Sequence, residues 1–202
     1  MMFGSKKNSE LERFAEIFEA AMVSLFLQRG EIKFSGVRKA RKKIMEYQGR
    51  MTADGSDKFV NQGASAMTTT KTYVSAVNFY ANKKDLEKKK TLGALIIYIE
   101  QSFLAKLMQL LKYPVVDDES DDAMLDSAGT LCNIIAGRFK SEVAKAGYVE
   151  LEMSHFMNHQ NKAFDGVSFC ENEFDYFELQ FDINDKKRLT VDMTMGTIPK
   201  VG

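Results

Sequence analysis

The sequence predicts an α+β fold, in which a largely antiparallel sheet carries helices packed on one face. Segments with the three-and-four spacing of amphipathic helices are segregated along the chain from runs of strand-like segments. Two strand-like segments near the end are joined by Asn184 and Asp185, which is typical of a β-hairpin. The near-continuous apolar run of residues 92–99 favours a central strand.

Length and composition indicate a globular protein with its own core. The chain has 202 residues, 45% of them hydrophobic, which suits one domain with or without an extension. Basic and acidic residues number 28 each, so nothing in the charge balance demands a nucleic acid or another polyanion as partner. We expect a single domain over residues 1–202, with an insertion at about 29–70.

Two further features bear on location. Cys132 and Cys170 lie far apart in apolar settings, which is typical of reduced core thiols. The polar, basic start of the chain, Met1 to Ser9, does not resemble a signal peptide, and no apolar stretch is long enough to span a bilayer. We therefore expect a cytoplasmic protein without a membrane partner.

The first part of the chain predicts helices. Residues 9–28 have helical spacing, with Ser9 as the expected N-cap and Gly30 as the stop. Residues 36–47 place Val37, Ala40, Ile44 and Tyr47 at helical spacing between five basic side chains, so we expect a second helix with a solvated basic face. A basic patch for a partner remains an alternative, and a nucleic-acid site is less favoured. Residues 52–70 read as a loop or insertion.

The remainder of the chain alternates between strands, connections and two helices. We expect helices over residues 101–111 and 123–146, the first ended by Pro114 and the second closed by Gly147. Acidic residues 117–122 complement the positive N-terminus of the second helix. Expected strands are residues 71–80, 91–99, 148–153, 176–183 and 188–195. Residues 82–90 read as a charged turn, and residues 155–174 as a polar connection.

Most standard catalytic motifs are absent from the sequence. It contains no glycine-rich phosphate loop, no nucleophile elbow and no Cys-x-x-Cys pair. His155 and His159 have the spacing that could hold a metal on a helix, but no carboxylate or thiolate stands close by as a third ligand. We expect no metal site in this chain.

The segment from Asp126 to Gly137 carries the most specific pattern. It resembles the signature helix of the CheX/CheC family of response-regulator phosphatases, and the residues that fit are Asp126, Gly129, Leu131, Asn133, Ile135, Ala136 and Gly137. The order of elements over residues 91–194 also resembles the family, as does the opening helix. The resemblance implies a CheC/CheX-like fold, whereas residues 29–70 do not fit it.

The resemblance also implies a function. In that family a phosphorylated, CheY-like receiver domain docks along the signature helix, and the Asn amide orients the water that attacks the aspartyl phosphate. Asn133 and Asp126 are therefore the expected catalytic residues, and Thr130, Gly129 and Gly137 the expected docking residues. Mg²⁺ is expected on the receiver, so this chain needs no cofactor of its own, and the chemistry is positioning and electrostatics.

One departure from the family pattern leaves the activity open. The glutamate that anchors the receiver's lysine falls on Thr130, which cannot form an ion pair, and Asp126 is shorter and lies one turn away. Asn133 has the structural alternative of a hydrogen bond to a neighbouring element, and the two glycines could serve close packing as well as docking. Three hypotheses remain: a phosphatase, a catalytically impaired binding module, and a structural or dimerisation domain. We further expect that a homodimer could form through a sheet edge.

Overall fold

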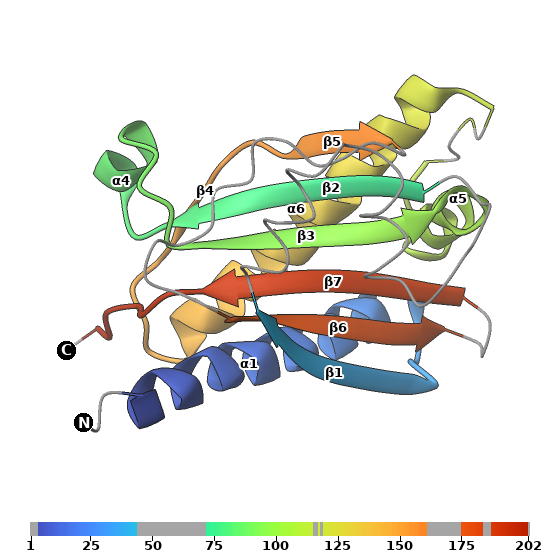
Figure 1. Cartoon of the computed structure of the whole chain (residues 1–202). Helices are drawn as coiled ribbons and strands as arrows, with labels where there is room; N and C mark the ends of the chain where they lie inside the picture. The colour runs from blue at the N-terminus through green and yellow to red at the C-terminus, as the bar shows by residue number, and fades with distance from the viewer. Residues whose placement is uncertain are drawn as a thin grey trace.

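A computed structural model describes residues 4–43, 72–114, 117, 119–160, 175–183 and 187–201. The helices are α1 (Gly4–Gly30), α4 (Lys83–Glu87), α5 (Gln101–Leu110) and α6 (Asp121–Lys145). The strands are β1 (Gly36–Lys43), β2 (Thr72–Tyr80), β3 (Gly93–Glu100), β4 (Glu152–Met153), β5 (Met157–Gln160), β6 (Asp175–Ile183) and β7 (Lys187–Met195). Figure 1 shows these strands as one sheet with α1 and α6 running across it.

The sheet is antiparallel throughout its described pairs. Its order is β1-β6-β7-β3-β2-β4, and β5 also pairs with β2. The predicted hairpin is confirmed, because β6 pairs with β7 in direct succession. The predicted central strand is confirmed as well, since β3 lies between β7 and β2.

One face of the sheet carries the helices and the main core. Alternate side chains of the inner strands, such as Tyr73, Leu95, Phe181 and Val191, pack with buried residues of α1, α5 and α6. Phe139 of α6 lies edge-on to both Phe18 of α1 and Phe79 of β2. The predicted α+β class, with helices on one face of an antiparallel sheet, is therefore confirmed.

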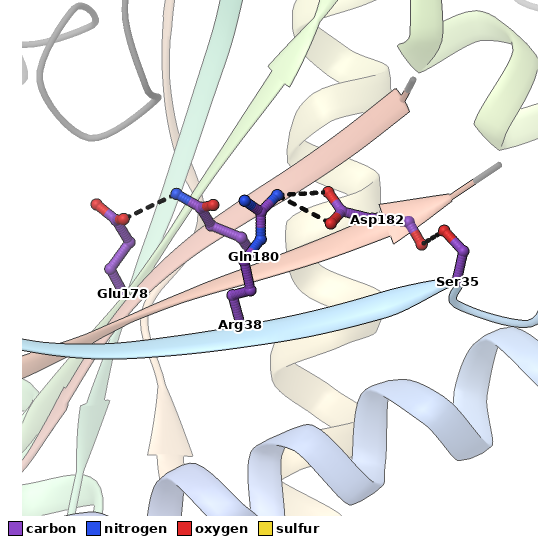
Figure 2. Close-up of polar contacts among 5 residues, drawn as sticks. All are labelled: Ser35, Arg38, Glu178, Gln180 and Asp182. Carbon is purple, nitrogen blue, oxygen red and sulfur yellow. Dashed lines mark hydrogen bonds and ion pairs between the residues drawn. The ribbon is translucent and has the colours of Figure 1, made fainter. Parts of the chain in front are cut away.

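The predicted helix over residues 36–47 is wrong, because residues 36–43 form the edge strand β1. Its basic side chains face acidic residues of β6: Arg38 pairs with Asp182 at 2.9 Å, Arg41 pairs with Asp175 and Lys42 pairs with Glu178. Figure 2 shows the part of this ladder around Arg38. Helical spacing and strand alternation both fit this short segment, and only the distant acidic partners decide between them.

Other boundaries differ in smaller ways. Helix α1 begins at Gly4, so the prediction of Ser9 as its N-cap is wrong, whereas its end at Gly30 is confirmed. The expected charged turn contains the short helix α4, capped by the Asn82 side chain. The expected strand over residues 148–153 reduces to an isolated bridge at Tyr148 and the two residues of β4.

Several expectations stay predictions. Residues 52–70, read as a loop, and Cys170 lie outside the described residues, and the domain boundaries with the insertion at about 29–70 stay predictions too. Homodimer formation is untested. None of the helices in the described ranges is both long enough and apolar enough to cross a membrane.

Candidate functional site

Helix α6 begins at Asp121, two residues before the predicted start at residue 123, and its N-terminus is capped by Ser120. The Ser120 hydroxyl accepts a hydrogen bond from the Ala123 backbone N–H at 3.3 Å, and Asp121 and Asp122 occupy the first turn. Carboxylates at this position are stabilised by the unpaired N–H groups and the helix dipole. The tyrosine hydroxyl of Tyr73 also donates to Asp121 at 3.1 Å, which ties the start of α6 to strand β2.

The inward face of α6 is fixed by core packing. Leu131, Cys132, Ile135 and Phe139 are buried against the sheet and its neighbouring helices. Burial raises the pKa of the Cys132 thiol to about 12, although the nearby Ser75 hydroxyl lowers it in part. The thiol therefore stays protonated at neutral pH and has no thiolate with which to act as a nucleophile.

The outward face of α6 presents the predicted site residues. Asp126 and Asn133 are exposed, and Thr130 and Gly137 are half-buried. Their spacing of four, three and four residues places all four along one side of the helix. Within the described part of the chain, no side-chain hydrogen bond or ion pair involves Asp126, Thr130 or Asn133. Among the described residues, the Asn133 side chain thus makes no hydrogen bond to a neighbouring element, which was the structural alternative for this residue.

The two glycines of the motif lie in different surroundings. A Cβ at Gly137 would have no neighbour within 4 Å among the described residues, so this position is open. A Cβ at Gly129 would lie 2.3 Å from the Phe156 ring, so the glycine there makes room for an aromatic side chain. The open position at Gly137 is compatible with a docked partner, whereas close packing against Phe156 requires a glycine at position 129.

Phe156 and Asn158 are the residues beside the site that the sequence did not single out. Both belong to the stretch expected to be a polar connection, part of which forms strand β5 beside β2. The Asn158 amide donates a hydrogen bond to the Leu125 carbonyl oxygen of α6 at 2.7 Å. One sequence signal was available, because a glycine inside a helix often marks the close approach of another group.

The described residues contain no group of three or more His, Cys, Asp or Glu side chains that could hold a metal ion. The helical spacing of His155 and His159 does not apply, because residues 157–160 are an extended strand. The outward face of α6 thus offers an amide, a hydroxyl and a carboxylate to a partner. Such a set can position a water molecule or a phosphoryl group.

Comparison with known proteins gives two findings, a family-model match over part of the chain and a fold shared with solved structures. The family model described as "Chemotaxis phosphatase CheX" matches residues 88–167, which include the whole of α6. A CheC-like superfamily protein from Shewanella sp. PV-4 superposes with a TM-score of 0.55 at 12% identity, over 89% of this chain and 95% of that chain. This chain has a CheC/CheX-like fold, and its residues 88–167 match the CheX family model.

Two more solved structures share the fold. The chemotaxis protein CheX from Vibrio vulnificus matches with a TM-score of 0.54 at 12% identity, over 90% of this chain and 97% of its own. The CheX-CheY-BeF3-Mg²⁺ complex from Borrelia burgdorferi matches with a TM-score of 0.52 at 14% identity, over 91% of this chain and 98% of that one. A search of curated proteins found no match. At these identities the structural likeness shows the fold alone.

Proposed function

We propose that this CheX/CheC-like chain docks a phosphorylated, CheY-like receiver on the outward face of α6 and assists hydrolysis of its aspartyl phosphate. The observation that carries the proposal is the exposure of Asn133 beside Asp126 on the matched helix. Solved structures of similar fold include a CheX bound to CheY with BeF3 and Mg²⁺, which supports a receiver as the partner.

In this proposal Asn133 does not form a covalent bond. Its amide oxygen accepts a hydrogen bond from the attacking water, and its amide N–H₂ remains free to donate to a phosphoryl oxygen. Water held in line with the scissile P–O bond loses little entropy on attack, so positioning alone accelerates the step. Mg²⁺ on the receiver would neutralise the phosphoryl oxygens, so this chain supplies no metal.

The charge around Asn133 favours a basic group on the partner. Asp122 and Asp126 are both exposed and lie one turn apart on α6. Thr130 provides no charge, so Asp126 is the carboxylate that would meet the receiver's lysine. If the Asp126 side chain is too short to reach that lysine, the chain binds receivers without hydrolysing their aspartyl phosphate. This is the second candidate function.

Turnover of a phosphorylated receiver tests the proposal. CheY-like receivers from the same organism are phosphorylated with a small-molecule donor, and phosphate loss is followed with and without the chain. We expect faster loss with at least one receiver, and Asn133→Ala should reduce that acceleration by about a hundredfold or more. If Asn133→Ala accelerates phosphate loss as much as the wild type does, another group must hold the attacking water.

A matched control separates this loss from general damage to a helix. Gln28 is an exposed amide side chain on α1, so Gln28→Ala removes an amide from a helix surface outside the proposed site. The control should keep both turnover and the melting temperature of the wild type. Equal losses in the two variants would argue against a specific role for Asn133.

Thr130→Glu distinguishes the phosphatase from the impaired binding module. Because Thr130 is half-buried on the docking face, a glutamate there can extend toward solvent and a receiver lysine. We expect turnover to rise by about tenfold or more. Binding of the receiver by the wild type, with turnover only in Thr130→Glu, would establish the second candidate function.

A further inference from the structure

Helix α6 lacks a side chain at the point where an aromatic ring covers it. A Cβ built on Gly129 would lie 2.3 Å, 2.4 Å and 2.8 Å from three carbons of the Phe156 ring. Real Cβ atoms essentially never make contacts below 3.0 Å, so with a side chain at position 129 the Phe156 ring would have to shift. The glycine is therefore what allows Phe156 to lie on the helix.

The covered position lies between the two exposed polar residues of the proposed site. Gly129 is three residues after Asp126 and four residues before Asn133, and both spacings bring side chains to the same strip of a helix. The Phe156 ring is thus flanked along α6 by an exposed carboxylate on one side and an exposed amide on the other. The ring itself is only partly buried, so it borders the docking face.

The backbone on both sides of Phe156 is held to the rest of the molecule. Ser154 receives a hydrogen bond from the Asn78 backbone N–H at 3.0 Å and donates its own N–H to the Asn78 carbonyl oxygen at 2.9 Å. From Met157 onward the chain pairs with β2, and Asn158 donates to the Leu125 carbonyl oxygen of α6 at 2.7 Å. The ring is therefore held in position by strand pairing and by α6 before any partner arrives.

We propose that Phe156 is a positioning residue of the docking face, an apolar wall that an apolar side chain of the receiver contacts beside its phosphorylated aspartate. This inference rests on the proposed function. In the docked complex, a ring fixed over Gly129, one turn from Asn133, would keep bulk water from that side of the amide and so strengthen the hydrogen bond that holds the attacking water. Aromatic anchors of this kind contribute a large share of the affinity of protein interfaces.

Affinity for a receiver that carries BeF3 and Mg²⁺ in place of the phosphoryl group tests the inference. Phe156→Ala should raise the Kd by about tenfold, and Phe156→Leu, which keeps an apolar surface, by less than about threefold. Gly129→Ala should raise the Kd in the wild type by displacing the ring. In the Phe156→Ala background the same alanine should change nothing, because no ring is left to displace.

Val143→Ala is the control for a purely structural role. Val143 is buried on α6 ten residues, more than two turns, after Asn133, so its truncation should lower the melting temperature without changing the Kd. If Phe156→Ala binds within about twofold of the wild type while Asn133→Ala still abolishes turnover, the inference fails and the proposed function stands. Additive effects of Gly129→Ala and Phe156→Ala would also overturn the inference. If the wild type binds none of the loaded receivers, both fail.

Discussion

Polar side chains gather in two regions of the described structure, and the two regions treat them differently. Between β1 and β6, basic and acidic residues pair across the strands, with Arg38 on Asp182, Lys42 on Glu178, and both Arg41 and Lys43 on Asp175. On the outward face of α6, Asp126 and Asn133 are exposed and have no hydrogen-bond partner among the described residues.

This difference distinguishes polar side chains that stabilise the fold from polar side chains that remain available to a partner. A charged side chain whose partner comes from its own chain stabilises the fold and has little left to offer another molecule. The basic residues of β1 also protect a sheet edge, since an edge strand rich in Lys and Arg resists pairing with a second sheet. The outward face of α6 keeps its donors and acceptors for a partner, so changes there should affect function and leave stability nearly unchanged.

The largest effect on stability is expected from Glu178→Ala. Glu178 is 5% exposed, and its carboxylate receives hydrogen bonds from both Lys42 and Gln180. Its removal leaves two partly buried donors without an acceptor and should lower the free energy of unfolding by about 2 kcal/mol. Asp126→Ala on the outward face should change it by less than about 0.5 kcal/mol. Chemical denaturation measures both, and equal losses would break the distinction between the two regions.

A smaller, pH-dependent effect is expected at Asp175. Burial acts to raise the pKa of its carboxyl, but the hydrogen bonds and charges of Lys43 and Arg41 outweigh burial and leave the pKa below its ordinary value. The resulting stability is present above the unfolded-state pKa of about 4 and is lost as the pH falls through the lower, folded-state pKa.

Asp175→Asn should therefore lower the free energy of unfolding by about 1 kcal/mol near neutral pH. The difference from the wild type should shrink below about pH 4, where the wild-type carboxyl is protonated as well. Unfolding curves recorded from pH 3 to pH 7 measure this. A difference that stays constant over the whole range would mean that the ion pairs of Asp175 contribute nothing.

The smallest effect is expected at the exposed end of the same ladder. The Arg38 side chain is 56% exposed in its pair with Asp182, so water and salt screen the attraction. Asp182→Ala should cost less than about 0.5 kcal/mol, and 1 M NaCl should remove what difference there is. The Ser35 hydrogen bonds to the Asp182 backbone carbonyl oxygen are kept in Asp182→Ala, so a larger, salt-resistant loss would mean that the exposed Arg38–Asp182 pair contributes as much as the buried pairs.

Much of the fold could be predicted from local pattern. The inward face of α6 follows from apolar residues at helical spacing, whereas the predicted start at residue 123 missed the Ser120 cap and the first turn at Asp121 and Asp122. The same periodicity is enough to place Asp126, Thr130 and Asn133 on one side of the helix. Their exposure agrees with that placement, while their roles in catalysis and docking stay predictions.

What the sequence could not determine depends on residues far apart in the chain. Residues 36–43 have a pattern that suits a helix or a strand, and they form β1 because acidic side chains of β6, more than 130 positions later, pair with them. Likewise, Gly129 within α6 shows only that something can approach closely. Which group approaches, the Phe156 ring, is decided by β5 pairing with β2. Local spacing determines which faces a helix or strand presents, and only tertiary packing determines what those faces meet.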